Sequence, residues 1–161
     1  MIKTLRKSKG FTLVELLIVI IIIGILAGMM MLSSGAATDK AEATKIVSDL
    51  RNIKAACIMY YADKGSYASL DNVEDLGAAS LGAPGSEINN YLDNKPASGY
   101  KIKKSGNVFF AGYNGTKLTD GVKDKLVLMA PNVGLYNGVS ADVSDYYKKT
   151  NADGVFMVIT K

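Results

Sequence analysis

The apolar residues divide the chain into segments of different character. Residues 11–32 are almost entirely apolar, with Thr12 and Glu15 as the main exceptions. As a helix this segment would extend ~33 Å, about the thickness of the hydrocarbon core of a bilayer. Residues 1–10 are polar and basic, and basic flanks stay on the cytoplasmic side. We therefore expect a leader over residues 1–10 and a single membrane-spanning helix over residues 11–32, with a cytoplasmic N-terminus.

The next segment, residues 33–65, is amphipathic. Apolar side chains recur at steps of three and four and predict one buried helical face, formed by Ala43, Ile46, Leu50, Ile53, Cys57 and Tyr60. Gly65 is expected to end the helix as a left-handed cap. A helix from about residue 11 to residue 63 would be ~80 Å long. Its first half therefore has to be covered by lipid or by other copies of the chain.

The remaining residues, 66–161, predict a globular region with a connecting loop and an antiparallel sheet. Four runs rich in β-forming residues predict strands, over residues 100–104, 107–113, 125–130 and 154–160. Ser105-Gly106 is a plausible two-residue hairpin turn, and residues 140–149 predict a short helix. The expected fold class is α+β, with the sheet packed on the second half of the long helix.

The net positive charge of the chain comes from the leader. The chain has 19 basic and 15 acidic residues, and four of the basic ones, Lys3, Arg6, Lys7 and Lys9, precede Gly10. Without them the two signs are equal, so composition predicts no basic nucleic-acid-binding face. We expect no specific nucleic-acid partner.

The composition also excludes several kinds of catalysis. The chain has no histidine and one cysteine, Cys57, so an internal disulfide, a histidine general base and a histidine-ligated zinc are ruled out within one chain. Cys57 lies on the apolar helical face, where a buried small residue is expected. Acidic groups such as Asp120 and Asp124 lack the spacing of an EF-hand loop. We expect no enzyme, no cofactor and no metal site.

Glu15 is the charged residue that needs an explanation. A carboxylate in an apolar span costs a few kcal/mol at the bilayer centre and less near the interface. Glu15 could remain solvated at the headgroup level, or it could bind a cation. A cut between Gly10 and Phe11 would create an α-amino group on Phe11. In a filament, that amine could pair with Glu15 of a neighbouring subunit and set the axial register, since an unpaired buried charge is heavily penalised.

The run Gly10-Phe11-Thr12-Leu13-Val14-Glu15-Leu16 resembles the class III signal of type IV pilins and type II secretion pseudopilins. The resemblance implies cleavage after Gly10 by a prepilin peptidase, N-methylation of Phe11 and a role for Glu15 in assembly. Two departures concern the subtype. Many pilins have a proline where Leu32 stands, and many close a C-terminal loop with a disulfide, which Cys57 alone cannot do.

The leading hypothesis from the resemblance is a structural subunit of an extracellular type IV pilus at the cell surface. The implied partners are identical or related pilin subunits, the prepilin peptidase and methylase, and an inner-membrane platform with its ATPase. One alternative keeps the family and predicts a pseudopilin of a type II secretion or DNA-uptake apparatus. Another predicts a lone membrane-anchored binding domain that retains the leader.

Overall fold

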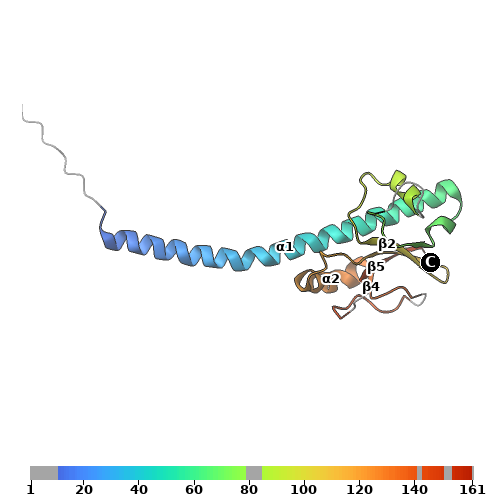
Figure 1. Cartoon of the computed structure of the whole chain (residues 1–161). Coiled ribbons are helices and arrows are strands. Elements are labelled where there is room, and N and C mark those ends of the chain that lie inside the picture. Colours follow the sequence, from blue (N-terminus) through green and yellow to red (C-terminus); the bar gives the residue numbers. More distant parts are fainter. Residues whose placement is uncertain (1–10, 79–84, 141–142, 151–153, 161) are drawn as a thin grey trace, which may run out of the picture. The chain divides into compact units, whose positions relative to one another are not determined.

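The computed structural model describes residues 11–78, 85–140, 143–150 and 154–160. Its α+β fold class agrees with the prediction: a long N-terminal helix, α1 (Leu13–Lys64), precedes a five-stranded antiparallel sheet. Contacts divide the chain into two units, Met1–Ala37 and Thr38–Lys161. Each unit is described separately below, and Figure 1 gives the element labels.

The first unit contains the apolar part of α1. Its large apolar side chains are about half exposed or more, from Leu13 at 86% to Val19 at 46%. An 18-residue window of α1 has a mean hydropathy of 2.9 and none of it is buried, so the helix is long and apolar enough to cross a membrane. A helix that is apolar all round needs lipid or protein on every side.

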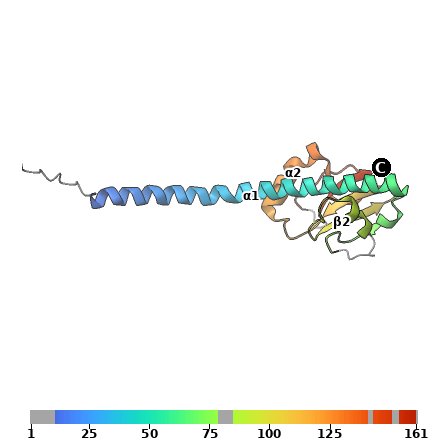
Figure 2. The ribbon, with the colours of Figure 1, turned by 90° about the horizontal axis from the view of Figure 1, so that it is seen from above.

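The second unit begins with the amphipathic half of α1, which lies across one face of the sheet (Figure 2). The predicted buried face is confirmed, because all six of its residues are at most 4% exposed. The helix ends as predicted at Gly65, which adopts a left-handed φ of 70° and donates its N–H to the Tyr61 carbonyl at 2.8 Å. This positive φ explains why glycine stands there.

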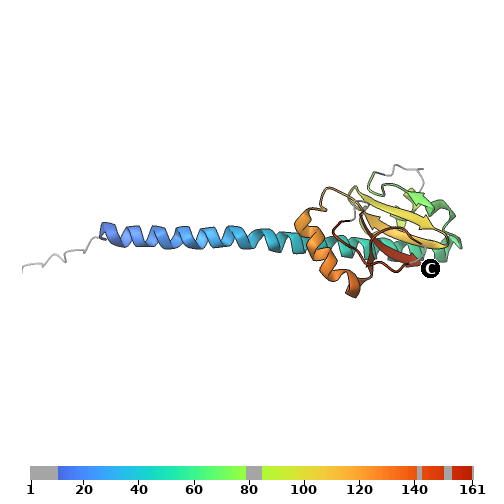
Figure 3. The ribbon, with the colours of Figure 1, turned by 90° about the horizontal axis from the view of Figure 1, so that it is seen from below.

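The sheet has the strand order β1-β2-β3-β5-β4, and Figure 3 shows it from the side opposite α1. The strands are β1 (Asn72–Val73), β2 (Tyr100–Ser105), β3 (Val108–Tyr113), β4 (Leu135–Tyr136) and β5 (Val155–Thr160). Three predicted strands are confirmed as β2, β3 and β5. The hairpin turn is shifted by one residue from the prediction: Ser105 pairs with Val108, so the loop is Gly106-Asn107.

Strand β3 is buried along its whole length, because both of its faces are covered. Phe109, Ala111 and Tyr113 belong to the main core beneath α1. Phe110 packs with Phe156 of β5 in a second cluster, against which Val139 and Val143 also pack. Two-sided burial explains why this strand is a continuous apolar run rather than an alternating one.

Two predicted elements are wrong. Residues 125–130 belong not to a strand but to the helix α2 (Asp120–Val133). Thr119 caps its N-terminus and Gly134 ends it with a left-handed φ of 75°, and Val122, Leu126 and Ala130 form its buried stripe. The cap and stop residues are local signals, and five of the six residues 125–130 are good helix formers, so the sequence itself favours the helix.

The predicted helix over residues 140–149 is also absent from the described part of that segment. Its residues pair with β4 instead: Tyr146 forms a bridge with Tyr136, and the Tyr147 N–H donates to the Leu135 carbonyl at 2.9 Å. Residues 141–142 lie outside the described residues. Two short 3₁₀ helices, η1 (Ala68–Leu70) and η2 (Ser86–Tyr91), lie in the connection between α1 and β2.

Candidate functional site

The first candidate site is the beginning of α1. Gly10 lies outside the described residues, whereas Phe11 is 86% exposed. The next residue, Thr12, precedes the first helical residue, Leu13. Two of the residues predicted or implied to be functional therefore stand at one helix terminus: Phe11, which follows the predicted cut, and Glu15 in the first turn.

Thr12 and Glu15 form a reciprocal cap on this terminus. The Thr12 N–H and hydroxyl both donate to Oε2 of Glu15, at 2.8 and 2.9 Å, and the Glu15 N–H donates to Oγ1 of Thr12 at 3.2 Å. This is a capping box, in which two backbone donors that the helix leaves unsatisfied find side-chain acceptors. The carboxylate also stands at the positive end of the helix dipole.

The capping box gives Glu15 a second role beside the predicted pairing with a neighbour's amine. The Thr-x-x-Glu spacing of residues 12–15 is the sequence signal for this cap. Glu15 therefore has a partner within its own chain. The structure describes one chain, so the pairing of Glu15 with the Phe11 amine of a neighbour stays a prediction.

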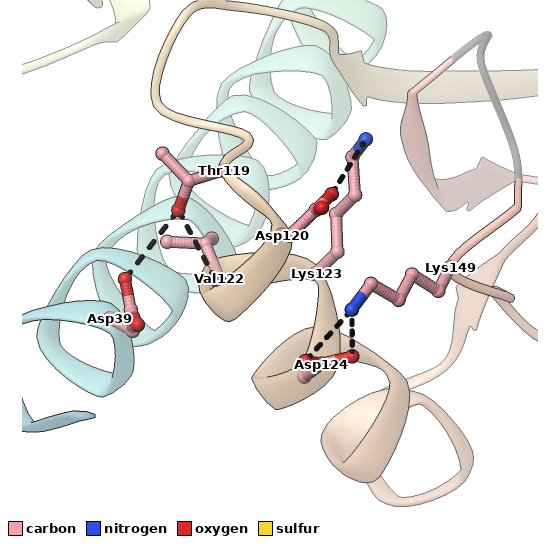
Figure 4. Close-up of polar contacts among 7 residues, drawn as sticks. All are labelled: Asp39, Thr119, Asp120, Val122, Lys123, Asp124 and Lys149. Carbon is pink, nitrogen blue, oxygen red and sulfur yellow. Dashed lines mark hydrogen bonds and ion pairs between the residues drawn. The ribbon is translucent and has the colours of Figure 1, made fainter. Parts of the chain in front are cut away.

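A second cluster of polar contacts joins α2 to α1 within the second unit (Figure 4). The Thr119 hydroxyl donates to Oδ1 of Asp39 at 3.5 Å and accepts from the Val122 N–H at 3.4 Å. Nζ of Lys117 lies 3.5 Å from Oε1 of Glu42, which is in the next turn of α1. On the other side of α2, Lys149 binds both carboxylate oxygens of Asp124, at 2.9 and 3.0 Å. These contacts hold the helix against its neighbours.

Acidic residues of α2 and of the C-terminal segment could in principle bind calcium, but those that the structure describes have other partners. Asp120 and Asp124 lie on α2 and pair with Lys123 and Lys149, and Asp145 pairs with Lys148. Asp142 and Asp153 lie outside the described residues. Among the residues that are described, no group of three His, Cys, Asp or Glu side chains is arranged to hold a metal ion.

Cys57 is fully buried in the main core. Burial disfavours the thiolate and raises the pKa of its thiol to about 12, so at neutral pH the group is protonated. A second buried feature is the Tyr100 hydroxyl, which donates to Oδ2 of Asp49 on α1 at 2.7 Å. Both features stabilise the packing of α1 on the sheet.

The chain is similar to one family of N-terminal motifs and to several proteins named as secretion components. The family described as the prokaryotic N-terminal methylation motif matches residues 5–31. The type II secretion system core protein G of Klebsiella pneumoniae is 33% identical over 96 residues, 60% of this chain and 65% of that protein. The proteins of the same name from Pseudomonas aeruginosa and Vibrio cholerae are 38% identical over 64 residues and 36% identical over 69 residues.

These alignments are partial. The Pseudomonas match covers 40% of this chain and 45% of that protein, and the Vibrio match covers 43% and 47%. The chain thus spans about half the length of most of the curated relatives it matches, and 65% of the Klebsiella protein, which is less than two thirds. No solved structure matches it.

Proposed function

Because the chain is a member of the type IV pilin and type II secretion pseudopilin family, we propose that it is a pseudopilin: a structural subunit that polymerises into a filament of a secretion apparatus. The observation that carries the proposal is the exposed apolar helix within residues 5–31, the part of the chain that the N-terminal methylation motif matches. The relatives described above are named as type II secretion components, which favours this alternative over the surface pilus that led the sequence analysis.

The proposed maturation follows the predicted segments. The leader, residues 1–10, is removed between Gly10 and Phe11, and the new amino group of Phe11 is methylated. Residues 11–32 then serve first as a single-pass anchor in the cytoplasmic membrane and later as the filament core. Residues 33–65 and the globular region 66–161 are translocated. Prepilin peptidase and methylase, related pilin subunits and an inner-membrane platform with its ATPase are the proposed partners.

The physical basis of assembly is burial of the apolar helix. Each subunit that leaves the bilayer needs a replacement for lipid around residues 11–31, and parallel helices of other subunits supply it. Glu15 then meets a low-dielectric surrounding, where the Phe11 amine of a neighbour is the proposed counter-charge. Pilins and pseudopilins are structural proteins, and we propose no enzymatic activity for this one.

Mass spectrometry of the N-terminal peptide in separated cell fractions tests the proposal. We expect a peptide that begins at Phe11 and carries one extra methyl group, found in the membrane fraction, and a loss of protein secretion when the gene is deleted. The same peptide in the sheared surface fraction would indicate an extracellular pilus instead. An intact Met1 leader in every fraction would contradict both and favour a lone anchored domain.

A further inference from the structure

Most of the charged side chains described for the second unit have an ion pair or a hydrogen bond, and the unpaired ones are almost all basic. Within the described residues, Asp93 is the one acidic side chain with neither an ion pair nor a hydrogen bond. On α1, Arg51 and Lys54 likewise have no such partner, and neither do Lys40, Lys45 and Lys64. Unpaired charges of opposite sign on two separate surfaces of one chain suggest a contact between copies of that chain.

Asp93 lies in the exposed loop that follows η2. This loop and α1 enclose an open hollow of about 560 Å³, whose lining includes Asp93, Asp49 and Met59. Lys45 and Lys95 also line it, so the hollow itself carries no net charge. Met59 is 53% exposed. We call this surface the Asp93 flank; it combines an unpaired carboxylate with an exposed apolar side chain.

Arg51 and Lys54 line a different groove of about 330 Å³, together with Tyr136, Met157 and other residues of the α2–β4 connection and β5. No acidic side chain lines this groove. Ile58, one helical turn after Lys54, is 48% exposed. We call this surface the Arg51 flank; it combines two unpaired cations with an exposed apolar side chain.

The two flanks lie on opposite sides of α1. Asp49 on the first flank and Arg51 on the second are two residues apart, which separates them by about 160° around a helix. Figures 1 and 2 both show the η2 segment on one side of α1 and α2 on the other. Two copies placed side by side can therefore present the Asp93 flank of one to the Arg51 flank of the next.

We propose that this contact, between the Asp93 flank of one copy and the Arg51 flank of another, joins neighbouring globular units in the filament. The inference rests on the proposed function. Such a contact pairs each unpaired carboxylate with two unpaired cations and brings Met59 against Ile58. Because the two surfaces differ, the contact is heterologous and leaves a free flank at each end, which is the geometry of an open filament.

Cysteine crosslinking in the membranes of cells that make the full chain tests the contact. The chain with both Asp93→Cys and Lys54→Cys should give a ladder of multimers with a short bis-maleimide, whereas either single variant should not. The native chain is the control, since its Cys57 is fully buried. Dimers from a single variant would indicate a symmetric contact. Crosslinks to a different protein would indicate that another partner occupies this surface. Either result would overturn the proposal.

Charge reversal gives an independent test by filament yield. Asp93→Lys or Lys54→Asp should each raise the unassembled fraction roughly two- to fivefold, the range expected for an exposed ion pair, and the two together should restore assembly. Lys125→Asp on α2, where Lys125 also has no ion pair, is the matched control. If the native chain forms filaments but the double charge reversal does not restore assembly, this contact is wrong and the proposed function stands. If the native chain forms no filament, both the contact and the proposed function are wrong.

Discussion

At the scale of single residues, Glu15 is bound more firmly than its position in an apolar run suggests. Its Oε2 accepts two hydrogen bonds from Thr12, so the carboxylate fixes the start of α1 as well as carrying a charge. A capping box can be formed by glutamate or glutamine, whereas a pairing with a neighbour's amine needs the charge. The two roles can therefore be separated by substitution.

Glu15→Gln is expected to leave cleavage intact but to reduce filament incorporation at least about tenfold. The glutamine keeps the cap, while the amine of the neighbouring Phe11 loses its counter-charge, and an unpaired buried charge costs several kcal/mol. Thr12→Val, which removes the hydroxyl of the cap and keeps the charge, should have the smaller effect. Incorporation is measured by immunoblot of the membrane-extracted filaments. Normal assembly of Glu15→Gln would mean that the cap, and not the charge, is what assembly requires.

Several tyrosines in the second unit predict a loss of stability at alkaline pH. Burial, and then the hydrogen bond to Asp49, raise the pKa of Tyr100 well above its usual value of 10.0, and burial also raises the pKa of Tyr113 and Tyr147. Below pH 10 these tyrosine hydroxyls are protonated in both the folded and the unfolded chain, so their full contribution to stability is present. Above it the unfolded chain loses protons first, so the free energy of unfolding falls as pH rises.

Urea unfolding of the chain in detergent at pH 8 and at pH 10.5, followed by circular dichroism, measures this loss. The denaturant midpoint should fall at the higher pH, and Tyr100→Phe should make the fall smaller because it removes one of the titrating groups. An equal fall in the variant would mean that Tyr100 does not contribute.

At the scale of elements, α2 is where the prediction and the structure disagree most. The run from residue 125 to 130 was predicted as a strand, but apart from Val127 it consists of Lys, Leu, Met and Ala, which favour helices, and it lies in a helix capped by Thr119 and ended by Gly134. The helix buries one stripe of side chains in the core. A hydrogen bond from Thr119 to Asp39 and an ion pair between Lys149 and Asp124 connect it to the neighbouring segments (Figure 4). Local propensity and tertiary packing therefore agree on the helix.

Two leucines of α2 separate the helix from the strand. In a strand, Leu126 and Leu128 would point to the same face, whereas in α2 Leu126 is fully buried and Leu128 is 72% exposed. Leu126→Ala should lower the free energy of unfolding by about 2–5 kcal/mol, and Leu128→Ala by less than about 0.5 kcal/mol. Urea titration of both variants measures the difference, and similar losses would contradict the helix.

At the scale of the whole molecule, the residues that form the core and those that anchor the chain are separate. Every residue of the main core lies at or beyond Ala43, in the unit that begins at Thr38. The exposed apolar residues 13–31 lie in the other unit. Folding and anchoring therefore depend on different parts of one helix.

A fragment that begins at Thr38 should accordingly fold without the anchor and remain in aqueous solution. It keeps the complete core, and it loses the large apolar surface that would otherwise drive association. Light scattering should give a monomer at micromolar concentration, and urea unfolding should be a single cooperative transition. Aggregation or gradual unfolding would mean that residues 11–37 contribute to the fold.

The sequence alone determined the features that depend on neighbouring residues. The apolar span, the motif around Glu15, the buried face of α1 and its end at Gly65 all follow from periodicity and from glycine's access to positive φ. Strands β2, β3 and β5 were also predictable, because each is a run of β-forming residues beside turn signals. The capping box of Thr12 and Glu15 was equally local and could have been predicted.

Only the tertiary structure decided the features that depend on distant residues. Residues 143–149 do not form a helix because their backbone pairs with β4. The opposite flanks with Asp93 and Arg51 also depend on how the loop after η2 and the strand β5 pack beside α1. A local pattern fixes which conformations a segment can adopt, and long-range packing selects among them.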